Sequence, residues 1–298
     1  MAERAAAPVL ALVFNAFVWG VSWLPFRMLH ERGLHPLWST ALIYFFSLLC
    51  LLAVRPAAWR PFRSEPLLWL LAAAAGLTNV GFNWGVTVGD VVRVVLLFYL
   101  MPAWSALLAW PLLGERPTPA ALLRLALALA GVLTVLHTGG GEWPLPREAA
   151  DWLGLMGGFS FALTNILLRR LHDAPAEARV LAMFGGGGAL AAATATAGLA
   201  QGLVAAVPAP QGGWVLVALL LGTAFLASNM ALQYGASRLP AHTTALVMLS
   251  EVVFASLSSV LLDAAQITWR VLLGALLILS AAGWSAWEGA RNGRAGAE

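Results

Sequence analysis

The chain has 298 residues, of which 60% are hydrophobic and 10% are charged, and its formal net charge is +3 at neutral pH. A soluble domain carries about a quarter charged residues, so this composition excludes an ordinary soluble domain and indicates a membrane protein. The seventeen basic residues are all arginines scattered between apolar runs, which argues against a nucleic-acid partner. The single cysteine, Cys50, excludes an intramolecular disulfide and a cysteine-rich metal site.

Ten apolar segments are long enough, or nearly so, to cross a hydrocarbon core of roughly 30 Å as helices. In chain order they cover residues 8–28, 37–54, 66–86, 91–113, 119–137, 151–168, 179–200, 213–234, 241–262 and 268–287. We expect the first segment to be retained, because Trp19, Trp23 and Phe26 occupy the region where a signal peptide needs small residues. The sequence therefore predicts an all-α membrane protein with ten transmembrane helices.

A sequence repeat divides the chain into two halves. Residues 19–31 (WGVSWLPFRMLHE) resemble residues 161–173 (FALTNILLRRLHD), with identical pairs at Arg27/Arg169, Leu29/Leu171 and His30/His172. A triplet recurs at one constant offset: Gly76, Asn83 and Gly89 match Gly222, Asn229 and Gly235. Because five segments separate the two copies of the first motif, the halves should enter the bilayer from opposite sides. We expect two inverted five-helix repeats, residues 1–138 and residues 139–298.

The arginine positions predict the orientation in the membrane. With a cytoplasmic N-terminus, twelve arginines fall on the cytoplasmic side and five on the far side. Basic residues concentrate on the cytoplasmic side of membrane proteins. We therefore expect a multi-pass protein of the bacterial inner membrane with both termini in the cytoplasm.

Polar side chains recur at helical spacing inside several apolar segments, so that each set shares one face. The sets are Asn15 with Trp19 and Ser22, Asn79 with Asn83 and Thr87, and Asn229 with Gln233. Such residues normally turn away from lipid, toward the helix bundle or a wet cavity. Each one alone is explained by a hydrogen bond between helices, but as a set they favour a polar-lined substrate cavity.

Glu251 is the one acidic residue that the pattern places clearly at mid-membrane depth. Thr244 and Ser258, seven residues to either side, share its helical face, so Glu251 is expected to face inward. A carboxylate there is costly without a partner or a proton. It is a candidate for proton coupling or for binding a substrate ammonium group. The alternative is a neutral glutamic acid that holds helices together.

Deep aromatic side chains accompany the polar set. Away from the segment ends, where an interfacial tryptophan belt is expected, lie Trp19, Trp84, Trp104, Phe82, Phe98, Tyr99 and Phe161. Aromatic stripes often serve packing, but next to the asparagines they suit an amphipathic substrate with an apolar body. Pro25, Pro102 and Pro111 predict bends, and four glycines at 185–188 predict either tight packing or a hinge.

Short motifs in a fixed order resemble the EamA-type exporters of the drug/metabolite transporter superfamily. They are Trp19-Gly20, Tyr99-Leu100-Met101-Pro102 and Leu113-Gly114-Glu115. Two departures are Val252 after Glu251, where the family often has proline, and Asp263-Ala264, where it has Gly-Glu. The deep aromatics most resemble the members that export aromatic amino acids. That resemblance implies a central cavity between the halves surrounded by Trp19, Asn79, Asn83, Tyr99, Met101 and Phe161.

The residues and the resemblance together predict a secondary transporter that exports amino acids, above all aromatic and hydrophobic ones, by alternating access. The substrate-site candidates are Asn15, Trp19, Asn79, Phe82, Asn83, Tyr99, Met101, Phe161, Asn229 and Gln233, with Glu251 as the coupling candidate. No GxxxxGK[ST], HExxH or GxSG motif occurs, so we expect no ATP-driven pump, no enzyme and no cofactor. The expected partners are a small-molecule substrate and the lipid bilayer, with the protein a monomer. The alternative is a drug or polar-metabolite efflux permease of the same superfamily.

Overall fold

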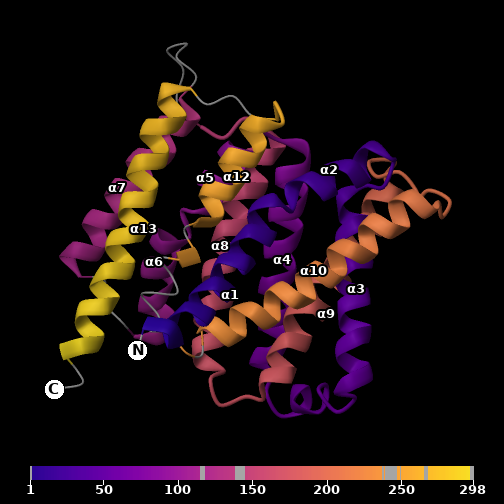
Figure 1. Ribbon diagram of the computed structural model, residues 1–298, viewed down its shortest axis with the longest axis horizontal. Coiled ribbons are helices and arrows are strands. Elements are labelled where there is room, and N and C mark those ends of the chain that lie inside the picture. Colours follow the sequence, from indigo (N-terminus) through magenta and orange to yellow (C-terminus); the bar gives the residue numbers. More distant parts are fainter. Residues whose placement is uncertain are drawn as a thin grey trace.

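The computed structural model describes residues 2–114, 118–137, 145–236, 238, 247–248, 250–264 and 268–295. This part of the chain is helical and contains no strand. The elements are α1 (Ala2–Val21), α2 (Trp23–Glu31), α3 (Pro36–Val54), the short 3-10 helix η1 (Arg60–Arg63), α4 (Leu67–Val88), α5 (Val91–Phe98), α6 (Met101–Leu113), α7 (Pro119–Leu136), α8 (Ala149–Arg170), α9 (Ala176–Ala200), α10 (Gly212–Ala236), α12 (Ser250–Leu261) and α13 (Trp269–Ala295). Figure 1 labels most of them.

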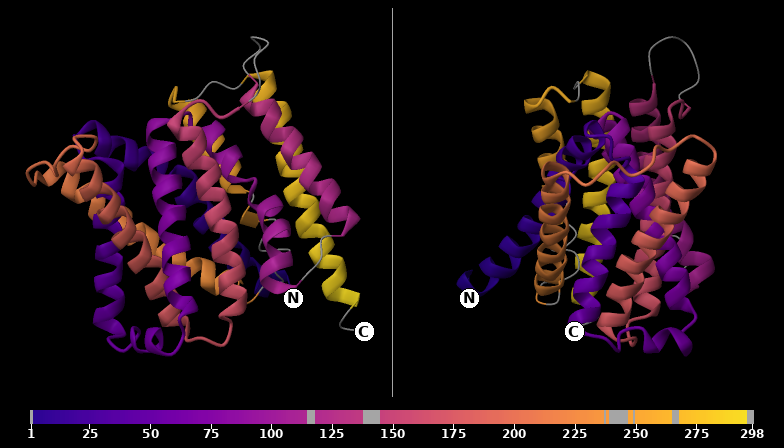
Figure 2. Two further views of the ribbon diagram at one scale, coloured as in Figure 1. Left: turned by 180° about the vertical axis from the view of Figure 1, so that it is seen from behind. Right: turned by 90° about the vertical axis from the view of Figure 1, so that its right-hand side faces the viewer.

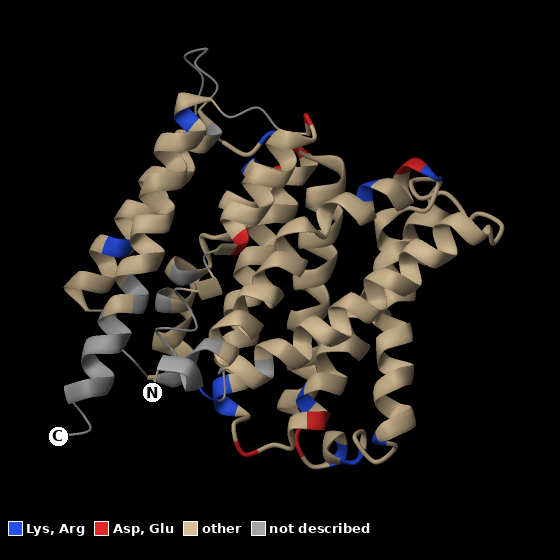
Figure 3. Ribbon diagram, in the orientation of Figure 1, with Lys and Arg blue, Asp and Glu red and all other residues tan. Residues whose placement is uncertain are grey.

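Among the described residues, seven helical stretches are long and apolar enough to cross a membrane, and three shorter apolar helices accompany them. Each of these ten helices overlaps one of the ten predicted segments, so the predicted positions are confirmed. The number of ten membrane crossings stays a prediction. Segment nine is described mainly from Ser250 onward, so its predicted first part, including Thr244, lies outside the described residues. So does Glu115 of the third motif. In Figure 3 most of the charged residues drawn in colour lie toward the two ends of the helices.

Two of the three predicted proline bends are helix breaks. The helix that starts at Ala2 ends at Val21, four residues before Pro25, and α5 ends at Phe98, four residues before Pro102. A proline ring clashes with the carbonyl group four residues earlier and has no N–H to donate to it, which explains the position of both breaks. The third proline, Pro111, lies inside α6, which continues through it to Leu113.

Helix α4 lies at the centre of the bundle, packed against α8 and α9, while α9 also packs against α3. Helix α1 packs against α10 and α12, and α10 also contacts α3. Helices α7 and α13 pair with each other along one side (Figures 1 and 2). Helix α1 begins and α13 ends toward the same end of the bundle (Figure 2).

Glycines set how closely several of these helices approach. The α-carbon of Gly186 in α9 faces the Ala72 carbonyl of α4 so closely that no Cβ would fit, and Gly76 in α4 faces the Gly186 carbonyl in return. Gly187 and Gly188 receive the rings of Tyr44 and Phe45, whereas Gly185 meets only leucine methyl groups at 3.9 Å or more. Of the two interpretations of the glycines at 185–188, tight packing between helices therefore accounts for three of the four residues.

Candidate functional site

A chain of aromatic contacts runs through the middle of the bundle and connects the two halves of the sequence. Trp19 of α1 stacks on Phe225 of α10, with ring centroids 4.6 Å apart and an interplanar angle of 18°. Its other neighbour is Phe82 of α4, whose ring meets that of Phe98 edge-on at 4.9 Å. Phe98 in turn contacts Phe161 of α8 at 5.4 Å. Four predicted site residues or deep aromatics thus form one connected cluster.

The aromatic cluster ends on a buried carboxylate. Tyr99 occupies the break between α5 and α6, and its ring contacts Phe98. Its hydroxyl group lies 3.2 Å from Glu251 Oε2 and 3.2 Å from the backbone oxygen of Met248. Glu251 is 8% exposed and Tyr99 is 2% exposed. The prediction that Glu251 faces inward is therefore confirmed, and a hydrogen bond joins it to a second predicted site residue.

Helix α1 touches α12 directly at this point. A Cβ on Gly20, the residue after Trp19, would lie 2.8 Å from the backbone oxygen of Glu251. One turn further along, Trp23 Nε1 of α2 donates a hydrogen bond of 2.9 Å to Ser258 Oγ. Glu251 and Ser258, predicted to share a helical face, thus both face hydrogen-bonding partners in the first half of the chain.

Three of the predicted asparagines, Asn15, Asn79 and Asn83, are buried, and each forms a hydrogen bond with a helix other than its own. Asn15 donates to the backbone oxygen of Ser228 at 2.9 Å and to its Oγ at 2.6 Å. Asn83 donates to Thr40 Oγ1 at 3.2 Å, and the Tyr44 hydroxyl donates to Asn79 Oδ1. Within the part of the chain that the structure describes, the side-chain oxygens of Asn15 and Asn83 accept no hydrogen bond. These buried acceptors remain free for a ligand or for water.

The remaining candidates lie around the same centre or outside it. Met101 is half-buried and packs against the cluster that contains Phe82 and Tyr99. Asn229 is half-buried, and the side chain of Gln233 lies outside the described residues. No group of three or more His, Cys, Asp or Glu side chains in the described ranges could hold a metal ion.

Sequence reasoning missed three residues of the centre, namely Phe225, Ser228 and Tyr44. Tyr44 contacts Phe225 at 6.1 Å as well as hydrogen-bonding Asn79, so it extends the aromatic chain to α3. The repeat contained a signal for the other two. At the offset that relates Asn83 to Asn229, Phe225 corresponds to Asn79 and Ser228 to Phe82.

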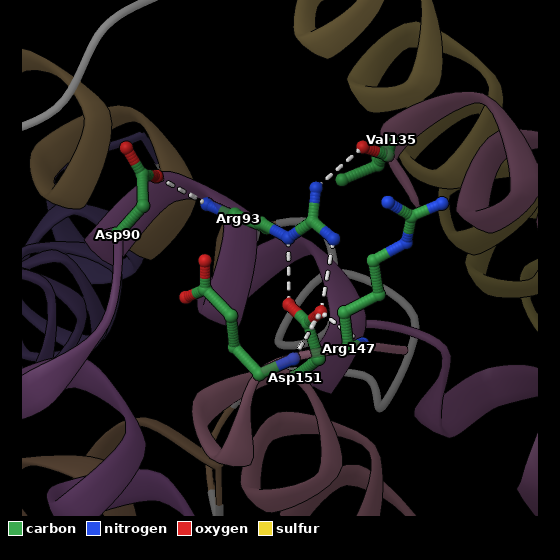
Figure 4. Close-up of polar contacts among 6 residues, drawn as sticks. Asp90, Arg93, Val135, Arg147 and Asp151 are labelled. Atoms are coloured by element: carbon green, nitrogen blue, oxygen red, sulfur yellow. Dashed lines mark hydrogen bonds and ion pairs between the residues drawn. The ribbon is translucent and has the colours of Figure 1, made fainter. Parts of the chain in front are cut away.

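A second polar cluster lies where α5 and α8 begin, away from the aromatic centre (Figure 4). Arg93 Nε and Nη2 bind the two carboxylate oxygens of Asp151 at 2.6 and 2.9 Å, and Nη1 donates to the Val135 backbone oxygen at 2.9 Å. Asp151 is 1% exposed, and it also accepts the backbone N–H of Arg147. This bidentate pair, together with the Val135 contact, ties α5, α7 and α8 together.

Comparison with known proteins shows similarity to one transporter family over part of the chain. Residues 6–137 match the EamA-like transporter family. The chain is 26% identical over 163 residues to an uncharacterized transporter of Pseudomonas aeruginosa and 28% identical over 179 residues to protein RarD of Streptomyces exfoliatus. These alignments cover 51% and 57% of this chain, and the chain spans about half the length of each relative, 51% and 54%.

A solved structure shares the fold across nearly the whole chain. It is described only as a crystal structure of a protein, aligns with a TM-score of 0.58 at 19% identity, and the alignment covers 96% of this chain and 98% of that one. The apolar helices and the family match together support a multi-pass membrane protein whose first half is similar to the EamA-like transporters.

Proposed function

We propose that the protein is a secondary transporter that exports amino acids, chiefly aromatic and hydrophobic ones, across the bacterial inner membrane by alternating access. The observation that carries the proposal is the connected aromatic cluster that ends on the Tyr99–Glu251 hydrogen bond. An apolar body beside a buried polar end is the surface that an aromatic amino acid needs. The sequence likeness to the aromatic amino acid exporter YddG, centred on Tyr99-Leu100-Met101-Pro102, supports the same substrate class.

The proposed ten-helix inverted repeat is supported by which helices pack together. If α4 corresponds to α10, α8 to α1 and α9 to α3, the contacts of α4 with α8 and α9 become those of α10 with α1 and α3, which are also present. The repeated glycines follow the same rule. Gly76 faces α9 and Gly89 faces α8, while Gly222 faces α3 and Gly235 faces α1. A site between two such halves is accessible alternately from each side when they rock.

The proposed orientation has both termini in the cytoplasm. It is supported by the arginine distribution and by the start of α1 and the end of α13 lying toward one end of the bundle (Figure 2). Cys50, the only cysteine, makes the test simple. In a Cys50→Ala background, cysteines placed at Ser64 and Asp173 should be labelled only from the cytoplasmic side, and a cysteine at Gln211 only from the periplasmic side.

The experiment that tests the function is uptake of labelled amino acids into proteoliposomes, with and without a pH gradient. Uptake of tryptophan, phenylalanine or methionine supports the proposal, and dependence on the gradient supports proton coupling, for which Glu251 is the candidate. If no amino acid is taken up but dyes or polar metabolites are, the alternative of a drug or metabolite efflux permease replaces it.

A further inference from the structure

Glu251 is a buried carboxylate that forms no ion pair with a basic residue in the described ranges. Tyr99 is the only residue in the described part of the chain that hydrogen-bonds to its side chain, and no ion pair joins it to an arginine there. The contrast with Asp151 is sharp, because that buried carboxylate has a bidentate arginine and two backbone donors. A carboxylate inside a membrane protein needs a compensating positive charge or a proton.

The hydroxyl group of Tyr99 does not satisfy this need. It has one proton to donate, and two acceptors, Glu251 Oε2 and the Met248 backbone oxygen, lie at the same 3.2 Å. One O–H proton cannot form a strong hydrogen bond with both. Each acceptor therefore keeps capacity for another donor, and the hydroxyl oxygen is itself an acceptor.

These three oxygen atoms match the three N–H donors of a primary ammonium group. The negative charge of the carboxylate also compensates the positive charge of an ammonium group that has left water. The aromatic rings of Phe98, Phe82 and Phe161 continue directly from Tyr99, and aromatic faces attract both apolar bodies and cations. Within the described residues, no ion pair joins an arginine to Tyr99, Glu251 or the rings beside them.

We propose that Glu251, Tyr99 and the Met248 backbone oxygen bind the ammonium group of the transported substrate, whose class is then a primary amine with an apolar, aromatic body. This inference rests on the proposed transport function. It makes the amino group, rather than the carboxylate, the feature that the site requires, so that an aromatic amine without a carboxylate is also a substrate.

The test uses full-length protein in proteoliposomes and three labelled compounds that differ in one group. Phenylalanine carries both charges, phenylethylamine keeps the ammonium group alone, and N-acetylphenylalanine keeps the carboxylate alone. We expect the first two to be transported, and N-acetylphenylalanine to be transported with roughly 10- to 100-fold lower kcat/KM, as expected for the loss of hydrogen bonds to a charged group.

Variants of Glu251 test whether this residue causes the preference for substrates with an ammonium group. In E251Q the preference for phenylethylamine over N-acetylphenylalanine should fall by roughly tenfold or more, and E251D should restore part of it. Asp173→Asn, at an exposed carboxylate (90% exposed), is the matched control and should leave the preference unchanged. A glutamic acid that only holds helices together would change the activity for all substrates alike and would leave the ratio intact.

The outcomes separate the two proposals. Transport of phenylethylamine but not of phenylalanine supports the ammonium site and overturns amino acid export. Equal transport of phenylalanine and N-acetylphenylalanine, or an unchanged preference in E251Q, overturns the ammonium site while leaving export standing. Transport of none of the three by wild-type protein overturns both.

Discussion

The hydroxyl group of Tyr99 lies 3.2 Å from Oε2 of Glu251, across 152 positions of the sequence. The contact joins the break between α5 and α6 to helix α12. It is therefore a direct polar link between the two halves of the chain at the end of the aromatic cluster.

Replacing Tyr99 with phenylalanine tests this link. The substitution keeps the ring and removes the donor, so the buried Glu251 carboxylate loses its hydrogen bond, which costs about 1–3 kcal/mol for a buried polar group. We expect a lower unfolding temperature in detergent for Y99F and for E251Q. In the double variant the two losses should not add, because both remove the same contact. Strict additivity would show that the two side chains do not interact.

The stacked pair of Trp19 and Phe225 should control affinity for the apolar part of the substrate. Truncating Trp19 to alanine removes the face that stacks on Phe225 and the edge that contacts Phe82. We expect KM for phenylalanine to rise by roughly tenfold, in the range that one aromatic contact contributes to binding. Trp110→Ala is the control, because Trp110 is 56% exposed on α6, and it should leave KM unchanged. Similar KM changes in both variants would place the site elsewhere.

Two adjacent glycines in α9 should respond oppositely to alanine. In Gly186→Ala the new Cβ meets the backbone of Ala72, which cannot move aside as a flexible side chain would. We expect this overpacking to cost about 1–3 kcal/mol in unfolding free energy. In Gly185→Ala the Cβ meets leucine methyl groups at ordinary contact distance, so stability should stay level or rise slightly because alanine favours the helix. Thermal unfolding of both variants in one detergent measures the difference, and equal stability would contradict the close approach of α4 and α9.

The Arg93–Asp151 pair should stabilise one end of the bundle. Asp151→Asn leaves Arg93 without its carboxylate, and we expect a loss of roughly 3 kcal/mol, the lower end for breaking a buried pair, since the Arg93 side chain keeps 22% exposure. The exposed pair of His172 and Asp173 is the comparison, and Asp173→Asn should have no measurable effect. Chemical unfolding of the two variants measures the loss of unfolding free energy in each. A stable D151N protein would show that the pair is not a structural anchor.

His35 should make stability depend on pH. Burial, together with the nearby His30, lowers the pKa of His35 below its ordinary value of 6.5, and its Nδ1 accepts the Leu37 N–H at the start of α3. The folded state therefore binds this proton less readily than the unfolded chain. The free energy of unfolding is therefore unaffected by His35 well above pH 6.5, and it falls as the pH drops below 6.5 because the unfolded chain binds the proton more readily. Unfolding temperatures at pH 7.5 and 5.5 should differ less in His35→Asn, which can still cap the helix. An equal pH dependence in both proteins would assign the effect to other groups.

The sequence predicted the positions of the helices well because bilayer thickness fixes the length of an apolar segment. It also predicted bends near Pro25 and Pro102, where the structure has helix breaks four residues before each proline. It did not predict which residues pair. Asn15 and Ser228 are 213 positions apart and Asn83 and Thr40 are 43 apart, so helix packing alone decides these partners. Phe225 was missed because a lone phenylalanine in an apolar helix carries no signal unless the repeat is used.

The proposed transport of aromatic amino acids through this centre is tested most directly by counterflow. Proteoliposomes loaded with unlabelled phenylalanine should accumulate labelled phenylalanine transiently when they contain the wild-type protein, and should accumulate clearly less of it when they contain Trp19→Ala and the labelled phenylalanine is kept below the wild-type KM. Absence of accumulation with wild-type protein, for phenylalanine and for tryptophan, would contradict the account.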